Sequence, residues 1–235
     1  MWLEARRALL LKEKEATQAH DTLAKERRAL PLVKVDKLYE FETSAGSKVK
    51  LLDLFEGRRQ LIVYHFMFSP DEAEGCSGCS VFADSIGHLS HLHSRDTTFA
   101  AVSRAPMSNI KPFHERLGWT FPWYSSGEGD FNYDFNVTLT NSRPLTDTRP
   151  LMYNYMSEEE TKRTTSPHGS DFTFDRSGLS VFLRDGDIIY HSYSTYARGT
   201  EPILSTYVLQ DLTPLGRVKE GNDIMFFQHH DKYKS

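Results

Sequence analysis

The chain has 235 residues, enough for one large domain and for a hydrophobic core that needs no disulfide or metal crosslinks. Charged residues make up 26% and hydrophobic residues 39%, which is a globular composition. The net charge of −4 argues against a protein that binds nucleic acids. The longest apolar run, residues 61–68, is too short to span a membrane, and the first residues lack the apolar core of a secretory signal. We therefore expect a cytoplasmic protein.

Apolar residues recur every seven positions near the start of the chain, which predicts an amphipathic helix over residues 1–30. The members of this row are Trp2, Leu9, Ala16, Leu23 and Leu30. The row fits a helix that packs along its own domain, and the alternative is an arm that joins two copies as a homodimer.

Residues 31–216 predict an α/β domain in which strands and helices alternate. Its expected elements, in chain order, are a strand pair at 38–41 and 49–52, a central buried strand at 61–68, a helix at 78–93, a strand at 97–103 and a helix at 108–117. This order favours a parallel sheet covered by helices. A hairpin at 179–193 and a helix at 202–212 follow.

Two segments carry no clear pattern. Residues 125–170 are rich in Gly, Ser, Asn and Pro with interspersed aromatic residues, and we expect them to form an irregular insertion in the domain. Residues 217–235 form a polar C-terminal tail that we expect to cover the surface loosely, and His229 and His230 within it are given no role.

The two cysteines of the chain, Cys76 and Cys79, form a C-x-x-C motif. Random placement of two cysteines gives this spacing in roughly one chain in a hundred. The motif follows the predicted central strand and precedes a helix, so Cys76 is expected at a helix N-terminus, where the helix dipole and free N–H groups stabilise a thiolate. We therefore predict that Cys76 is a nucleophile and that Cys79, one turn later, resolves a mixed disulfide.

Further segments resemble one known family. They are GCSGCS (75–80), VSRAP (102–106), GWTFPW (118–123), GLSVF (178–182), HSYSTY (191–196) and DLTPLGR (211–217). With the long charged helix, these segments look like the DUF899 family over nearly the whole chain. The resemblance implies a thioredoxin-like fold, with a central mixed sheet flanked by helices, a long N-terminal helix and an inserted aromatic-rich segment. It implies no defined activity.

The sequence departs from redox-active thioredoxins at two places. Those proteins carry a cis-proline before the strand that faces the C-x-x-C motif, whereas this chain has Ser177 and Gly178 there. In thioredoxins this proline helps to present backbone to the substrate and keeps metal ions off the thiols. Between the cysteines, Ser77 and Gly78 replace the usual Gly-Pro pair. The peroxiredoxin pattern Pro-x-x-x-Thr-x-x-Cys is not matched either.

Other side chains are candidates for the same site. Arg104 follows a predicted strand and is expected to stabilise a thiolate or hold an anionic substrate, with a salt bridge as the alternative. His191 is the candidate third ligand of a metal held by Cys76 and Cys79, with a structural role as the alternative. Trp119, Trp123, Tyr124 and Gly178 are expected to bind the substrate beside the thiols, with simple core packing as the alternative.

Three functions remain open at this point. The first is a thiol–disulfide oxidoreductase acting on a disulfide or peroxide without a cofactor. The second is a Cu(I)- or Zn-binding protein that uses the two cysteines and histidine. The third is a non-redox module that binds a small molecule or a protein on a thioredoxin scaffold.

Overall fold

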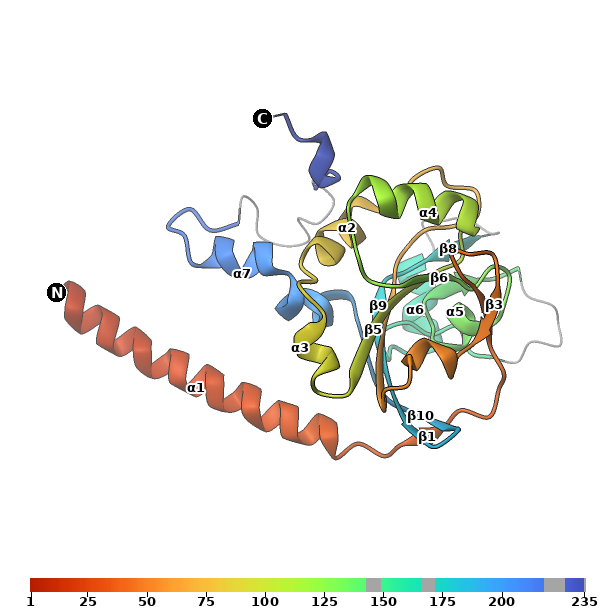
Figure 1. The fold of residues 1–235 in the computed structure, drawn as a ribbon. Helices are drawn as coiled ribbons and strands as arrows, with labels where there is room; N and C mark the ends of the chain where they lie inside the picture. Colours follow the sequence, from red (N-terminus) through yellow and green to blue (C-terminus); the bar gives the residue numbers. More distant parts are fainter. Residues whose placement is uncertain (143–148, 166–171, 218–226, 235) are drawn as a thin grey trace.

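The computed structural model describes residues 1–142, 149–165, 172–217 and 227–234. Within these residues, one mixed sheet forms the centre of the molecule (Figure 1). Its strands, in spatial order, are β1 (Val33–Lys34), β10 (Ile188–Tyr196), β9 (Gly178–Asp185), β4 (Gln60–His65), β5 (Thr97–Ser103), β6 (Trp123–Ser125), β2 (Glu40–Glu42) and β3 (Lys48–Lys50). A small second sheet pairs β7 (Thr138–Thr140) with β8 (Thr173–Asp175).

The central strands have thioredoxin topology. β4 pairs in parallel with β5 and antiparallel with β9, and β9 pairs antiparallel with β10. The connection from β4 to β5 contains α2 (Ser77–Asp84) and the short α3 (Ser90–His93), and the helix that links β5 to β6 is α4 (Met107–Arg116). The predicted thioredoxin-like fold class, with its mixed sheet, flanking helices and long N-terminal helix, is therefore confirmed.

Each face of the sheet has its own hydrophobic core, because alternate residues of the buried strands point to opposite faces. The face that we call the thiol face is covered by α2 and α4, and its core includes Tyr64, Phe66, Phe82, Phe113 and Trp123. The opposite face, which we call the histidine face, is covered by η1 (Asp53–Phe55) and α5 (Phe131–Asp134), and its core includes Phe41, Leu54, Phe55, Phe131 and Phe182.

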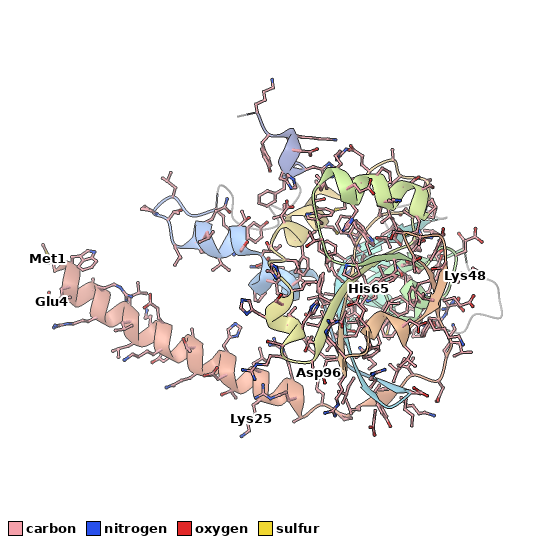
Figure 2. All side chains as sticks on the ribbon, viewed as in Figure 1. Met1, Glu4, Lys25, Lys48, His65 and Asp96 are labelled. Atoms are coloured by element: carbon pink, nitrogen blue, oxygen red, sulfur yellow. The ribbon has the colours of Figure 1, made fainter. Side chains whose placement is uncertain are left out.

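Helix α1 (Trp2–Arg28) projects away from the sheet, and its side chains stand clear of the body along most of its length (Figures 1 and 2). None of its residues is buried. Its last turn contacts the body, where the guanidinium of Arg27 lies 5.3 Å from the ring centre of Tyr193. Its apolar row is therefore exposed to solvent.

Three predictions about local structure need correction. The helix expected at 78–93 is two helices, because α2 ends at Asp84 and α3 (Ser90–His93) begins six residues later. The segment 125–170 is not irregular throughout, since it holds α5, β7 and α6 (Glu158–Thr165), although residues 143–148 and 166–170 lie outside the described residues. The final helix is shorter than expected, with η3 (Ala197–Ile203) before α7 (Ser205–Asp211).

The described part of the C-terminal tail does not lie loosely on the surface. It ends in η5 (His230–Lys232) and packs near α2 and α4 (Figure 1). His229, just before this turn, is only 6% exposed. No pattern in the sequence predicts this contact, since the tail is short and polar.

Candidate functional site

The two cysteines lie where the sequence predicts them, at the start of the helix that follows the central strand. Cys76 is the N-cap residue of α2 and is half-buried, and Cys79 lies in the first turn and is buried. Both are free thiols. The carbonyl of Cys76 accepts hydrogen bonds from the backbone N–H and the hydroxyl of Ser80, both at 3.0 Å, which fixes the turn that carries the sulfurs.

The two thiols have very different acidities. A hydrogen bond from the Cys79 thiol lowers the pKa of Cys76 to about 6, with help from the backbone N–H groups of Cys79 and Gly78 and against the effects of burial and of Glu72. Burial raises the pKa of Cys79 well above its usual range, and its hydrogen bond to Cys76 adds to this effect. The arrangement therefore favours a thiolate on Cys76 and a protonated thiol on Cys79.

Tyr64 lies behind Cys79 and is not among the site residues predicted from the sequence. Its ring stacks on Phe82 of α2 with 3.9 Å between ring centres. Its hydroxyl hydrogen-bonds to the Cys79 sulfur and partly offsets the effect of burial on the pKa of that thiol. The backbone N–H of Met67 also points at this sulfur, at 3.5 Å. Strand alternation could have identified Tyr64, because it lies two residues before Phe66 on the same face.

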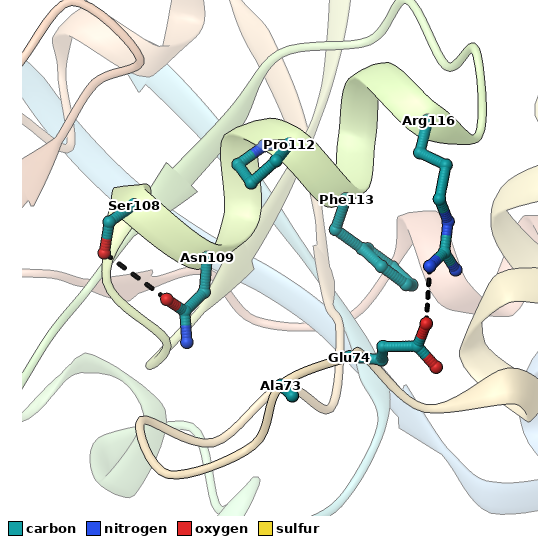
Figure 3. A pocket seen from close by; sticks show the side chains of 7 residues that line it. All are labelled: Ala73, Glu74, Ser108, Asn109, Pro112, Phe113 and Arg116. Carbon is teal, nitrogen blue, oxygen red and sulfur yellow. Dashed lines mark hydrogen bonds and ion pairs between the residues drawn. The ribbon is translucent and has the colours of Figure 1, made fainter.

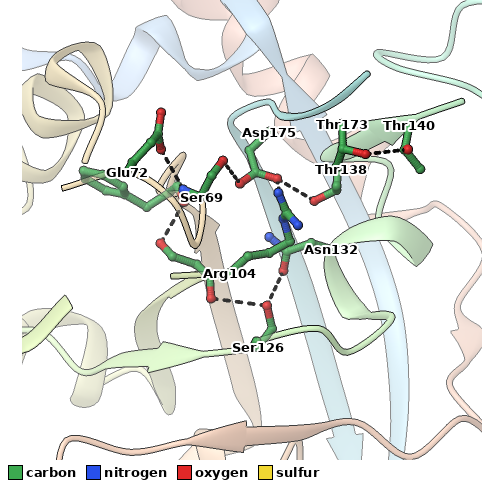
Figure 4. A network of polar contacts seen from close by, with 12 residues as sticks. Ser69, Glu72, Arg104, Ser126, Asn132, Thr138, Thr140, Thr173 and Asp175 are labelled. Atoms are coloured by element: carbon green, nitrogen blue, oxygen red, sulfur yellow. Dashed lines mark hydrogen bonds and ion pairs between the residues drawn. The ribbon is translucent and has the colours of Figure 1, made fainter. Parts of the chain in front are cut away.

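Arg104 is paired with a carboxylate. Its Nε donates to Asp175 at 2.8 Å, and both side chains are buried. Asp175 also accepts hydrogen bonds from the hydroxyls of Thr138, at 2.7 Å, and Ser69, at 3.0 Å (Figure 4). Ser69 belongs to the loop that leads from β4 to Cys76. The salt bridge that the sequence left as an alternative is present, and it anchors the cysteine loop.

The aromatic residues expected beside the thiols do not form one pocket. Trp119 donates its indole N–H to Asp84 at 2.7 Å and stacks with Phe121. Trp123 is buried in the thiol-face core, where it donates to the hydroxyl of Ser103 at 3.0 Å. Tyr124 packs on the histidine face instead. Trp119 and Trp123 do lie together on the thiol face, with 5.7 Å between their ring centres, but Tyr124 does not join them, because adjacent residues of β6 point to opposite faces.

Gly178 lies at the start of β9, opposite His65 of β4. A Cβ atom on Gly178 would lie 2.5 Å from Cδ1 of Tyr196, so close packing of that ring requires a glycine. The described residues contain no cis peptide bond. Just before Gly178, the carbonyl of Ser177 accepts a hydrogen bond from the hydroxyl of Tyr153 at 3.1 Å.

His191 is not brought to the cysteines. Its ring packs against Phe135 and Phe182 on the histidine face, and its Nε2 is hydrogen-bonded to Ser194 at 2.8 Å. A bulge in β10 follows His191. In the described parts of the chain, no group of three or more Cys, His, Asp or Glu side chains could hold a metal ion. The expected ligand set of Cys76, Cys79 and His191 is therefore wrong.

A groove of about 560 Å³ lies next to the loop that carries Cys76 (Figure 3). The residues that line it, from this loop and from α4, are Ala73, Glu74, Ser108, Asn109, Pro112, Phe113 and Arg116. The amide of Asn109 donates to the carbonyl of Glu72 at 3.1 Å and ties the two walls together. The aromatic candidates from the sequence line none of this groove.

Comparison with known families places the chain. A model of the family described as "Bacterial protein of unknown function (DUF899)" matches residues 1–233. The chain therefore belongs to the DUF899 family, as the resemblance of its motifs indicated. No curated protein sequence matches it significantly.

Several solved structures are similar in fold at low sequence identity. Peroxidoxin BcpB from Mycobacterium tuberculosis is 14% identical, with a TM-score of 0.44 over 75% of this chain and 94% of that one. A peroxiredoxin Q from Xanthomonas campestris is 14% identical, with a TM-score of 0.44 over 72% and 90%. Peroxiredoxin 6 of Arenicola marina is 12% identical, with a TM-score of 0.46 over 77% and 74%. None of the helices in the described ranges is long and apolar enough to cross a membrane.

Proposed function

We propose that the protein is a thiol–disulfide oxidoreductase in which Cys76 attacks the substrate and Cys79 completes the exchange. The observation that carries this proposal is the difference between the two thiols at the start of α2. Hydrogen bonds from Cys79 and from backbone N–H groups lower the pKa of Cys76 to about 6, whereas burial raises that of Cys79. A nucleophile that is ionised at neutral pH and a partner that holds its proton suit the two successive steps.

The reaction on a disulfide runs in two displacements. The Cys76 thiolate attacks one sulfur of the substrate, so that a mixed disulfide forms and the other substrate sulfur leaves as a thiolate. Cys79 then loses its proton and attacks the Cys76 sulfur, which releases the second substrate thiol and leaves a Cys76–Cys79 disulfide. The protein gives up two electrons, and an external dithiol reductant must restore both thiols.

Residues around the thiols have supporting roles in this proposal. Tyr64 and the N–H of Met67 stabilise the Cys79 thiolate while it attacks. Arg104, through Asp175 and Ser69, holds the loop before Cys76 in place. The groove beside this loop is the proposed entry for a substrate, in place of the expected set of Trp119, Trp123, Tyr124 and Gly178.

A trapping experiment tests the assignment of the two cysteines. Reduced Cys79→Ser protein is mixed with oxidised glutathione, and its intact mass is measured after acid quenching. We expect a stable adduct of one glutathionyl group on Cys76, because the second displacement cannot occur. Cys76→Ser is the matched control and should stay unmodified, since Cys79 is buried. Equal labelling of both variants would contradict the assignment.

The same variants separate a disulfide from a peroxide substrate. With a peroxide, the Cys76 thiolate would attack an oxygen, form a sulfenic acid and release an alcohol or water. Cys79 would then form the disulfide and release water. Reaction with hydrogen peroxide at least 100 times faster than with oxidised glutathione would identify peroxide as the substrate. The reverse order would identify a disulfide.

Helix α1 is the proposed contact for a homodimer. Its apolar row is exposed, with Leu9 at 51% and Leu23 at 43%, and pairing with a second copy would remove it from water. Light scattering should give a dimer mass for the protein and a monomer mass for the Leu9→Glu, Leu23→Glu double variant. A monomer mass for both would exclude the dimer.

Because the reaction needs a pool of reductant, we propose a cytoplasmic location.

A further inference from the structure

The C-terminal segment, residues 227–234, touches the loop that carries Cys76 through His229. Its Nε2 lies 2.9 Å from the carbonyl oxygen of Gly75, the residue before Cys76. Its Nδ1 lies 3.2 Å from a guanidinium nitrogen of Arg116. A carbonyl only accepts and a guanidinium only donates, so both bonds form together when the ring proton is on Nε2. The ring also packs edge-on against Phe113, with 5.2 Å between ring centres.

Charged side chains fix the same segment on either side of His229. Lys232 pairs with Glu74, which also pairs with Arg116. Arg116 reaches back to Asp231 at 3.2 Å. These cations lower the pKa of Glu74 to about 2, with Arg116 as the larger cause. The segment is therefore bound by several contacts to two residues that line the groove beside the cysteine loop.

A further hydrogen bond ties the segment to the helix that carries the cysteines. His230 Nδ1 lies 2.8 Å from Asp84, the last residue of α2. Asp84 also accepts the indole N–H of Trp119 at 2.7 Å. The segment thus touches both ends of the structure that presents the thiols, with Gly75 just before α2 and Asp84 at its end.

Aromatic rings also pack closely against Gly75. A Cβ atom on Gly75 would lie 2.6 Å from Cε1 of Phe66 and 3.0 Å from Cε1 of Phe113. The backbone at Gly75 is thus held between these rings and the hydrogen bond from His229. The next residue, Cys76, depends on this position for its alignment with the N–H groups of Gly78 and Cys79.

We infer that the C-terminal segment is a clamp on the cysteine loop and that His229 is a positioning residue for the Cys76 sulfur. His229 holds the carbonyl of Gly75 and Phe66 packs closely against the same residue, so Cys76 sits where the first turn of α2 can donate hydrogen bonds to it. Without the clamp, the loop moves and the sulfur loses part of this contact. The biological meaning of the clamp rests on the proposed function, but its physical effect does not.

The test measures the acidity of Cys76 in a Cys79→Ser background, where it is the one remaining thiol. The rate of alkylation by iodoacetamide is followed against pH, and its midpoint gives the pKa of Cys76. His229→Leu removes both hydrogen bonds, and His229→Gln keeps a donor near the position of Nε2. His20→Leu, an exposed histidine on α1, is the matched control.

We expect the midpoint to rise by about one pH unit in His229→Leu, so that alkylation at the pH of the original midpoint becomes about fivefold slower. His229→Gln should restore most of the original midpoint, and His20→Leu should not change it. A purely structural role for His229 would lower thermal stability in the Leu variant without moving the midpoint, and that result would overturn the inference.

A deletion of residues 227–235 covers the case in which His229→Leu does not fold. It removes the clamp without leaving an apolar side chain against a free carbonyl, and the same shift in midpoint is expected. Faster hydrogen exchange in the peptide 72–80 should accompany it. An unchanged midpoint and unchanged exchange would overturn the inference. Since no step uses a disulfide substrate, failure of the proposed oxidoreductase activity would not affect either measurement.

Discussion

The two faces of the central sheet bury titratable groups in different surroundings. On the thiol face, Cys76 receives hydrogen bonds from Cys79 and from the backbone at the start of α2, and its pKa falls to about 6. On the histidine face, His65 lies among aromatic rings with a hydrogen bond to Ser180 at 2.8 Å, and burial lowers its pKa to about 3. At neutral pH, Cys76 on the thiol face is therefore ionised, whereas His65 on the histidine face is neutral.

Burial alone does not decide which of these groups is ionised. Burial disfavours the charged form at all these sites, and it prevails for His65 and for Cys79. At Cys76 the donors aimed at the sulfur outweigh it. The hydroxyls of Ser180 and Ser194 hydrogen-bond to each other and link His65 to His191. They carry no charge that could stabilise a protonated histidine. The thiol face therefore stabilises an ionised side chain at Cys76, whereas the histidine face keeps His65 neutral.

The largest expected effect separates the two faces by activity. Cys76→Ser should slow the reduction of an aromatic disulfide such as 5,5′-dithiobis(2-nitrobenzoate) by about 10³-fold or more, because a serine hydroxyl stays protonated at neutral pH. His191→Gln on the histidine face should change the rate by less than twofold. Initial rates of thiolate release at 412 nm measure both.

The metal-binding alternative predicts the opposite for the histidine. If Cys76, Cys79 and His191 shared a metal, His191→Gln would lose bound metal and change the rate as strongly as Cys76→Ser. Metal analysis of the purified variants, alongside the rates, would expose that result.

The next effect concerns the anchor of the cysteine loop. Arg104→Met should destabilise the fold by about 3 kcal/mol, because Asp175 is left buried without its cation. Arg198→Met breaks the ion pair of an exposed arginine with Glu201 and should cost far less, because water screens that pair. Urea unfolding of the two variants compares them directly. Equal losses would mean that the buried pair is no stronger than the exposed one.

The buried His65 of the histidine face should make the stability of the protein fall in acid. His65 has a pKa of about 3 in the folded protein, against about 6.5 in the unfolded chain. The unfolded chain therefore binds the proton first, and stability that is complete above pH 6.5 is lost as the pH falls towards 3. Between pH 7 and 5 this loss amounts to about 2 kcal/mol.

Urea unfolding at pH 7 and pH 5 measures this slope. His65→Gln keeps a polar partner for Ser180 but cannot take up a proton, so its stability should fall by about 2 kcal/mol less than that of the unmodified protein over this range. Identical slopes for the two proteins would show that His65 is not held neutral by the fold.

The smallest expected effect lies at Tyr64. Tyr64→Phe keeps the ring stacked on Phe82 but removes the hydroxyl from the Cys79 sulfur, so the second displacement should slow by about tenfold. Tyr153→Phe is the matched control, because the hydroxyl of Tyr153 bonds to the backbone of Ser177 and Ala197. Stopped-flow decay of the mixed disulfide measures the step, and equal decay in both variants would remove Tyr64 from the mechanism.

The central part of the fold could be predicted from the sequence because its signals are local. The continuous apolar run at 61–68 marked the buried strand, and the C-x-x-C spacing after it marked the start of a helix. The wrong grouping of Trp123 and Tyr124 was avoidable, since adjacent residues of a strand face opposite sides. The position of His191 was harder, because a bulge in β10 next to it shifts the alternation.

The contacts that hold the cysteine loop could not be predicted in this way. His229 is hydrogen-bonded to Gly75, which is 154 positions away in the sequence, and Ser69 is hydrogen-bonded to Asp175, which is 106 positions away. Neither pair leaves a periodic pattern, because each is a single polar contact between segments that are far apart in the sequence. Such contacts follow only from the folded backbone, which brings the ends of β4 and β5, the loop before β9 and the C-terminal segment to one edge of the sheet.

The central claim is that Cys76 and Cys79 form a redox pair, and a redox titration tests it most directly. The protein is equilibrated in glutathione buffers of defined potential, free thiols are alkylated, and the intact mass is measured. The account predicts one two-electron transition between about −150 and −300 mV, with an intramolecular disulfide as the oxidised form. If no disulfide between the two cysteines forms at any potential, the proposed function is wrong.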